Sequence, residues 1–319
     1  IIYSDKGESY GKNINPYLAF ADDIIVSNHN DSEKLNNFPK IVFGNMPRSK
    51  YLILTNDDKN KLVQRYPETE VYFKKYIGAD EYINGNFRYT IWIDQDEYTK
   101  LDKIQEFHQL FENVRQERLN SKAAGTRETA STPWKFVQRG EWDEMFSKGK
   151  IEGKFQLLVP AVTSEDRDYI PMGFVGDDTI ISNRCYIVYD TPVWLLGCLV
   201  SKMHIKWFQA IGGKLETRYS YSAGLVYNTF PIPELSEARK NMLEEAVFEM
   251  LDVREEEGGT MAELYGGANK PMNDRLRQAH EKIDGIVERA YQQKPFESDE
   301  ERLSVLLNLY KEMTEKEAK

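Results

Sequence analysis

Residues 211–233, with the sequence IGGKLETRYSYSAGLVYNTFPIP, place side chains of opposite charge at alternating positions. Lys214, Glu216 and Arg218 are followed closely by tyrosines. Residues two apart on a β-strand project from the same face, so an expected strand over 214–220 presents the three charges together. Arginine offers several hydrogen-bond donors in a fixed fork, whereas a carboxylate only accepts. From the spacing alone, an exposed ion pair of small energetic value is favoured over a binding site.

Other kinds of chemistry have weaker signals. The histidines are scattered along the chain, at His29, His108, His204 and His280, so their spacing predicts no metal site. His204 lies in an apolar segment and is interpreted as a core residue. The chain has no glycine-rich phosphate loop and no Gly-x-Ser-x-Gly nucleophile turn. The acids of TSEDRDY (163–169) favour a polar turn, with the acid–base pair of a hydrolase as the weaker alternative.

Length and composition indicate a soluble globular chain. The 319 residues suggest about two domains, with 40% hydrophobic and 29% charged residues. No apolar run approaches the roughly 20 residues that span a membrane. The first residues lack both a signal pattern and a starting Met, so we expect an internal piece of a longer protein. Cys185 and Cys198 lie in apolar contexts, which predicts buried thiols in a reducing compartment such as the cytoplasm.

The charge is distributed unevenly. A net charge of −10 argues at first sight against a nucleic-acid partner. Residues 1–230 contain 29 basic and 31 acidic side chains, whereas residues 231–319 contain 13 basic and 21 acidic ones. The acidity is therefore concentrated in the C-terminal quarter, and local basic faces are compatible with the rest of the chain.

Periodicity predicts an α+β region followed by an all-α bundle. Apolar residues at three- and four-residue spacing predict a helix over 96–120, and Pro192 opens an apolar helix that ends at Gly212-Gly213. Asn84-Gly85 is typical of a β-hairpin turn. Strands are expected at 23–27, 39–44, within 155–190, at 214–220 and at 225–230, with a short helix within 68–78. The C-terminal helices are expected at 235–256, 273–291 and 298–316, after a boundary near 233.

Several stretches occur in an order that resembles one family. They are KNINPYLAFADDIIV, PKIVFGNMPRSKYLILT, YIGADEYINGNFRYTIWI, YIPMGF, SKMHIKWFQAIGGKLETRYSYSAGLVYNTFPIP and LRQAHEKIDGIVERAYQQKPFESDEERLSVLLNLYKEMT. Together they resemble the C-terminal half of MmeI-like enzymes, and the resemblance extends over essentially all of residues 12–316. These are single-chain type II restriction–modification proteins that fuse a nuclease, an adenine methyltransferase and a target recognition domain.

The resemblance implies a domain organisation. Residues 1–13 would be a linker remnant from a methyltransferase domain, 14–233 the target recognition domain and 234–319 the C-terminal helical domain. The nuclease and methyltransferase would lie upstream, so this chain is itself expected to be non-catalytic and to need no cofactor. S-adenosylmethionine and Mg²⁺ are expected for the parent enzyme. The expected partners are double-stranded DNA and the upstream methyltransferase, in a bacterial cytoplasm and without a membrane.

The resemblance also implies site residues. The family's Tyr-Asn-x-Phe-Pro motif matches residues 227–231, and its base-specifying residues lie just before that motif. Glu216 and Arg218 match the Glu-x-Arg pair there, with Lys214 beside them. Arginine can donate two hydrogen bonds to guanine and glutamate can accept one from cytosine, so these residues are expected to read bases. Candidates for contacts with the DNA backbone or grooves are Lys122, Arg127, Arg139, Ser164, Arg167, Lys202, Lys206, Tyr219, Tyr221 and Ser222.

Two differences from the family's motifs and one alternative function weigh against this interpretation. Thr163 and Asp166 differ from the family's Ser-Ser-Glu-Arg-Arg stretch, and SKAAGTR at 121–127 has lost one arginine. The rival is an acidic protein-docking or regulatory module without DNA readout. DNA reading predicts Lys214 and Arg218 on a concave basic surface, whereas docking predicts that these residues are dispersed or buried.

Overall fold

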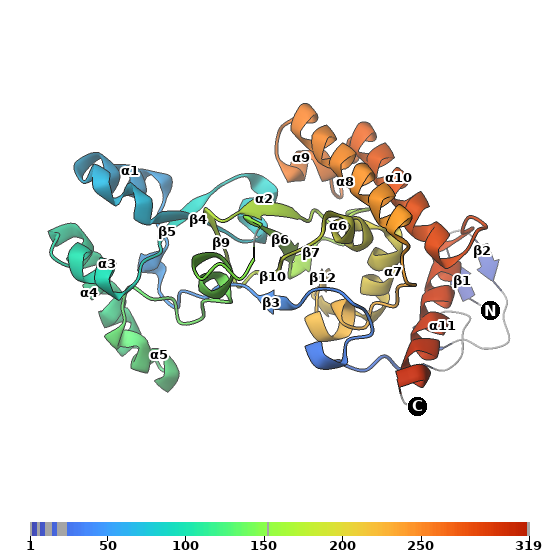
Figure 1. Ribbon diagram of the computed structural model, residues 1–319, viewed down its shortest axis with the longest axis horizontal. Helices are drawn as coiled ribbons and strands as arrows, with labels where there is room; N and C mark the ends of the chain where they lie inside the picture. Colours follow the sequence, from blue (N-terminus) through green and yellow to red (C-terminus); the bar gives the residue numbers. More distant parts are fainter. Residues whose placement is uncertain (1, 5–6, 10–14, 18–23, 152, 318–319) are drawn as a thin grey trace. The chain divides into compact units, whose positions relative to one another are not determined.

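The structure is a computed structural model that describes residues 2–4, 7–9, 15–17, 24–151 and 153–317. The chain forms two compact units, and each draws on segments that are distant in sequence (Figure 1). The first unit contains 1–41, 160–173 and 191–319, and the second contains 42–159 and 174–190. The described residues form the α+β region and the C-terminal helices that the sequence predicts.

The second unit is built on two small sheets. One has the strand order β3-β10-β6-β8 and the other β5-β4-β9. In the latter, Lys75 lies opposite Tyr89 in an antiparallel pair and opposite Thr179 in a parallel pair. The strands are β3 (Ile41–Phe43), β4 (Phe73–Ile77), β5 (Arg88–Ile91), β6 (Phe155–Pro160), β8 (Gly173–Gly176), β9 (Thr179–Ile181) and β10 (Cys185–Tyr189).

Short helices complete the second unit. They are α1 (Asn56–Arg65), α2 (Ala79–Asn84), α3 (Gln95–Leu101), α4 (Gln105–Leu119) and α5 (Ala124–Glu128). The helix predicted over 96–120 is divided into α3 and α4, and its apolar stripe is confirmed along α4, where Phe107, Phe111 and Val114 are buried. The Thr55 side chain accepts a hydrogen bond from the backbone N–H of Asp58 and so caps α1.

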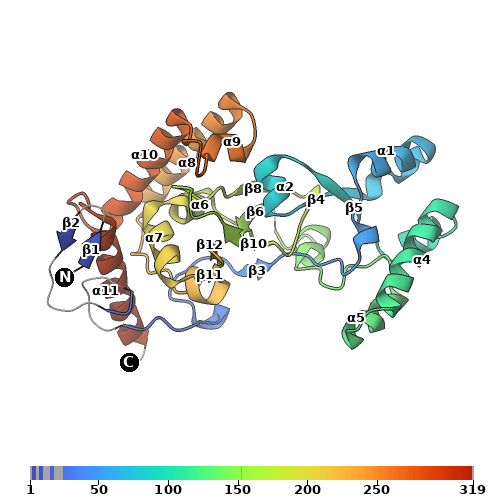
Figure 2. The ribbon, with the colours of Figure 1, turned by 180° about the vertical axis from the view of Figure 1, so that it is seen from behind.

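The first unit is mainly helical. Its helices are α6 (Val193–Val200), α7 (Lys202–Ile211), α8 (Glu237–Glu257), α9 (Met261–Tyr265), α10 (Asp274–Tyr291) and α11 (Asp299–Glu317). Helices α8 and α10 lie side by side in Figures 1 and 2. Gly197 allows α6 to approach them closely, because an added Cβ would lie 3.1 Å from Val247 and 3.3 Å from Leu243. The three long C-terminal helices predicted from the sequence are confirmed.

The strands of the first unit are short. They are β1 (Ile2–Ser4), β2 (Gly7–Ser9), β7 (Val162–Thr163), β11 (Gly213–Leu215) and β12 (Arg218–Ser220). The order β11-β12-β7 makes a three-stranded sheet. Among the described helices, none is long and apolar enough to cross a membrane.

Several sequence predictions are wrong in detail. Gly85 has φ 73° and ends α2, so Asn84-Gly85 is a helix C-terminus where we expected a hairpin turn. Residues 67–72 form a 3₁₀ turn that leads into β4, where we expected a helix. Of the strand expected at 23–27, residue 23 lies outside the described residues and 24–27 form no strand. The apolar helix predicted from Pro192 is interrupted at Ser201, whose ψ of 156° is extended.

A buried histidine holds α7 against the sheet. His204 has no exposed surface, and its Nε2 lies 2.9 Å from the hydroxyl of Tyr221. Burial lowers the pKa of His204 to about 4, so the imidazole is neutral in the folded protein. The interpretation of His204 as a core residue is confirmed.

This depressed pKa predicts loss of stability in acid. The unfolded chain takes up a proton near pH 6.5 and folded His204 does not, so stability falls as the pH drops from 6.5 towards 4. From pH 7 to pH 5, His204 accounts for a loss of about 2 kcal/mol. Urea unfolding at both pH values should therefore show a smaller acid loss for His204→Gln than for the parent. His108→Gln, at an exposed histidine, is the control, and equal losses in all three proteins would contradict the prediction.

Candidate nucleic-acid interface

The three predicted base readers lie on a tight hairpin. Strands β11 and β12 are antiparallel, with Leu215 opposite Arg218 and Lys214 opposite Tyr219. Glu216 occupies the turn between them with φ 58°, a left-handed conformation that is uncommon for a residue with a side chain. The predicted strand over 214–220 is therefore wrong. The alternation of charges spans a chain reversal, so the expected common face of one strand does not exist.

The hairpin nevertheless brings the predicted pair together. Arg218 Nη2 donates to Glu216 Oε2 at 3.0 Å, and the two side chains are 48% and 78% exposed. The Lys214 ammonium lies 5.5 Å from the centre of the Tyr219 ring. Exposed pairs of this kind are worth about 0–1 kcal/mol, so little energy opposes their rearrangement around a ligand.

A fourth charged residue, Glu165, lies beside the turn of the β11–β12 hairpin. Strand β7 pairs with β12, Thr163 opposite Tyr219, which brings the following loop beside the hairpin. A hydrogen bond from the Thr217 side chain, helped by the positive charges of Arg218 and Lys214, lowers the pKa of Glu165. Glu165 was not among the predicted site residues. The sequence around it, TSEDRDY, does not indicate that β7 pairs with β12 and so brings Glu165 to the hairpin. We define the reading tip as Lys214, Glu165, Glu216, Thr217 and Arg218.

Aromatic rings support the base of the hairpin. The Phe208 ring of α7 lies 5.8 Å from that of Tyr219 and 5.0 Å from that of Tyr221. Tyr221 is only 3% exposed, and Ser222 Oγ accepts a hydrogen bond from the N–H of Leu225. The contacts of Tyr221 and Ser222 are thus structural, while DNA contact by the half-buried Tyr219 stays a prediction.

The chain after Ser222 also differs from expectation. Ala223–Tyr227 form a π-helical turn, so the strand predicted at 225–230 is wrong. The Tyr-Asn-x-Phe-Pro stretch that follows is buried. The hydroxyl of Tyr227 donates to the carbonyl of Pro39 at 2.9 Å, and Asn228 Nδ2 donates to the carbonyl of His29 at 2.9 Å. This stretch therefore fixes the segment of residues 29–39 and presents no base-reading group of its own.

Two of the predicted backbone-contact residues of the first unit have partners on the C-terminal helices. Lys202 Nζ lies 3.6 Å from Asp284, and Lys206 Nζ lies 2.9 Å from Asp299. Arg167 Nε donates to the carbonyl of Gly266 at 3.2 Å, and burial lowers its pKa. Ser164 Oγ contacts the Asp166 carboxylate at 3.3 Å.

The remaining candidates belong to the second unit. Arg139 donates to Asp143 at 2.7 Å and lies 4.2 Å from the ring centre of Trp92, so its contacts are structural. Arg127 is exposed and donates to the carbonyls of Ser121 and Lys122 at 2.8 and 2.9 Å. The Lys122 side chain is also exposed.

Metal and thiol chemistry has no site in the part of the chain that the structure describes. No group of three or more His, Cys, Asp or Glu side chains gathers there as metal ligands. Cys185 and Cys198 are free and buried, and burial raises the pKa of Cys198 to about 12. The reading tip offers hydrogen-bond donors and acceptors to a ligand, without an activated nucleophile.

Known families and a solved structure match nearly the whole chain. The family described as "MmeI, target recognition domain" matches residues 20–234, and "MmeI, C-terminal domain" matches 235–317. "DNA methyltransferase A" of Bacillus subtilis (strain 168) is 47% identical over 319 residues, covering 99% of this chain and 34% of that protein. The solved structure of the Type IIL restriction-modification enzyme MmeI in complex with DNA superimposes with a TM-score of 0.84 at 34% identity. That match covers 96% of this chain and 39% of the MmeI chain.

The chain therefore spans between 34% and 39% of the length of these two relatives. Its matched residues account for nearly all of its own length, in the order target recognition domain and then C-terminal domain. The chain belongs to the MmeI family of restriction–modification enzymes.

Proposed function

We propose that this chain reads double-stranded DNA and directs adenine methylation by an upstream methyltransferase domain. The observation that carries the proposal is the exposed reading tip, where Glu216 and Arg218 pair at 3.0 Å beside Lys214. The family relationship supports it, because MmeI was solved in complex with DNA. Cleavage of DNA is proposed only for a parent protein that also carries a nuclease.

The chemistry of the tip suits base reading. A guanidinium can donate two hydrogen bonds to guanine, and a carboxylate can accept one from the cytosine amino group. Each good contact discriminates by about 1–3 kcal/mol, more than the roughly 0–1 kcal/mol of the exposed Glu216–Arg218 pair. Exchanging that pair for base contacts is thus favourable at a matching base pair. At a wrong one, Glu216 repels the polyanion and lowers affinity.

Phosphate contacts would set the register of the tip on the duplex. We propose Lys122 and Arg127 for this role because both side chains are exposed. Ser164 and Tyr219, next to the tip, are further candidates for backbone or groove contacts. We propose structural roles for the remaining candidates, namely Arg139, Arg167, Lys202, Lys206, Tyr221 and Ser222.

The parent protein would supply the catalysis. We propose residues 14–233 as the reading domain, 234–319 as the helical domain that supports it, and 1–13 as the link to the methyltransferase. S-adenosylmethionine would provide the methyl group and Mg²⁺ would serve a nuclease, both bound by domains outside this chain in a bacterial cytoplasm. This chain alone would have neither activity.

The rival docking function is less well supported. It expects Lys214 and Arg218 to be dispersed or buried, yet both are exposed and close enough to Glu165 to lower its pKa. A hydrolase at 163–168 has still less support. Asp168 pairs with Arg277 at 2.8 Å, and Asp166 accepts from Ser164, so these acids do not face a common reaction centre.

Replacing Arg218 tests base reading. The chain is joined to the upstream part of the Bacillus subtilis relative, and methylated sites are mapped by sequencing. Arg218→Gln should shift the preferred base at one position towards adenine, because an amide matches adenine as a guanidinium matches guanine. The preference should change by about tenfold or more. Arg275→Gln, at another exposed Arg–Glu pair, should leave the methylated sequence unchanged. If Arg218→Gln methylated the same DNA sequence as the parent, the proposal would be wrong.

The salt dependence of binding tests the phosphate contacts. Lys122→Ala should make the slope of log affinity against log salt shallower by about 0.9, as expected for the loss of one phosphate contact. Lys206→Ala, whose ammonium contacts Asp299, should leave the slope unchanged. Fluorescence anisotropy with a short duplex measures both slopes in the same joined protein. Equal slopes for Lys122→Ala and the parent would remove Lys122 from the interface.

A further inference from the structure

The reading tip is held by two separate supports. On one side, β7 pairs with β12, Thr163 opposite Tyr219, and continues into the loop that carries Glu165. On the other side, α7 contributes Phe208 and His204, which contact the two tyrosines at the base of the hairpin. The orientation of the tip therefore depends on how the 163–169 loop and α7 are fixed relative to each other.

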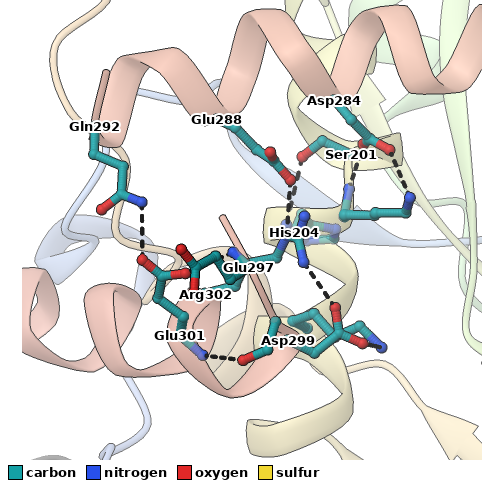
Figure 3. A network of polar contacts seen from close by, with 12 residues as sticks. Ser201, His204, Asp284, Glu288, Gln292, Glu297, Asp299, Glu301 and Arg302 are labelled. Atoms are coloured by element: carbon teal, nitrogen blue, oxygen red, sulfur yellow. Dashed lines mark hydrogen bonds and ion pairs between the residues drawn. The ribbon is translucent and has the colours of Figure 1, made fainter. Parts of the chain in front are cut away.

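Both supports end on one buried carboxylate of the C-terminal helices. The hydroxyl of Tyr169, at the end of the loop, donates to Asp284 Oδ2 at 2.6 Å. The backbone N–H of Lys202, the first residue of α7, donates to Asp284 Oδ1 at 2.7 Å. Figure 3 shows Asp284 pointing from α10 towards the turn at Ser201. Each oxygen of this side chain thus holds one of the two supports.

The surroundings of Asp284 fit a fixed position. The side chain is 5% exposed, and it lies at the N-terminus of α7, where the helix dipole favours a negative charge. The Lys202 ammonium lies 3.6 Å away. One turn earlier on α10, the His280 ring stacks on the Tyr169 ring with centres 4.3 Å apart. Tyr169 is consequently held both by its ring and by its hydroxyl.

A second contact ties α7 to α11. Lys206 contacts Asp299 at 2.9 Å, and Arg302 connects Asp299 with Glu288 of α10 at 3.0 and 2.7 Å (Figure 3). These contacts join α7, which supports the hairpin, to α10 and α11. The supporting helix therefore has partners at its first and its fifth residue.

We propose that Asp284 and Tyr169 are positioning residues for base reading, through which the C-terminal helices set the accuracy of sequence recognition without touching DNA. The proposal rests on the proposed DNA-reading function. Hydrogen bonds to base edges need donors and acceptors held within a narrow range of distance and angle. Loss of the Asp284 contacts would let the loop and α7 shift apart, and the tip would then fit correct and incorrect base pairs more equally.

Two substitutions test this in the full-length methyltransferase that contains the chain. Tyr169→Phe removes one hydroxyl and keeps the ring on His280, and Asp284→Asn keeps the shape of the side chain. The readout is kcat/KM for methylation of the cognate site, divided by kcat/KM for sites altered at the base pair that Arg218 reads. We expect this ratio to fall by about tenfold, within the roughly 5- to 150-fold that one base contact provides. The change should lie in KM, with kcat on the cognate site nearly unchanged.

A matched control separates positioning from general destabilisation. Lys282 lies on α10, as Asp284 does, and makes an exposed ion pair with Glu249 of α8. Lys282→Ala removes this pair and should keep the ratio of kcat/KM values. All variants are assayed well below their melting temperatures, with folding checked by circular dichroism. If Asp284→Asn does not fold, Tyr169→Phe alone decides.

The possible outcomes are distinct. A folded Tyr169→Phe or Asp284→Asn enzyme with an unchanged ratio would overturn the positioning role, since lower stability alone reduces activity equally at every site. Arg218→Gln in the same assay tests the reading function itself. A changed base preference in Arg218→Gln, together with an unchanged ratio in the other two variants, would leave DNA reading intact and reject only the positioning.

Discussion

The reading tip depends on a hairpin that is too short to hold its own shape. Strands β11 and β12 contain three residues each, and their turn carries a glutamate with φ 58°. Isolated two-stranded hairpins are marginal in water, because few hydrogen bonds offset the entropy of ordering the backbone. The conformation of Glu216 is therefore imposed by β7 on one edge and by the aromatic side chains of α7 beneath. Much of the first unit serves to keep these two supports in place.

This constraint also explains where the acidic residues lie. The net charge of −10 argues at first sight against a nucleic-acid partner, and most of it lies in the last quarter of the chain, yet some of the acids there have internal cationic partners. Asp284 and Asp299 face the two lysines of α7, and Arg302 joins the second of these acids to Glu288. The net charge of the chain therefore says little about the binding face, because some of the acidic side chains form ion pairs between helices. The charges of the reading tip, by contrast, are exposed and available to a ligand.

Sequence patterns predicted the elements governed by local rules. The C-terminal helices expected at 235–256, 273–291 and 298–316 are confirmed with nearly the same bounds. The hairpin was missed because the Lys214–Arg218 alternation suits a continuous strand as well as a reversal, and no glycine marks the turn. Asn84-Gly85 was misread because the same dipeptide suits a hairpin and a helix C-terminus. The neighbourhood of Glu165 and Thr217 depends on pairing between strands far apart in sequence, which local spacing does not encode.

The buried stretch after the hairpin and the exposed tip obey different physical constraints. Tyr227 and Phe230 have no exposed surface, and replacing such side chains by alanine costs about 3–5 kcal/mol. Exposed positions such as Arg218 usually tolerate change within about 0.5 kcal/mol. The residues proposed to discriminate between bases can therefore be exchanged with little effect on folding, provided that the supports beneath them are kept. Stability resides in the buried stretch and the helices, whereas the identity of the recognised base would reside in a few solvent-exposed atoms.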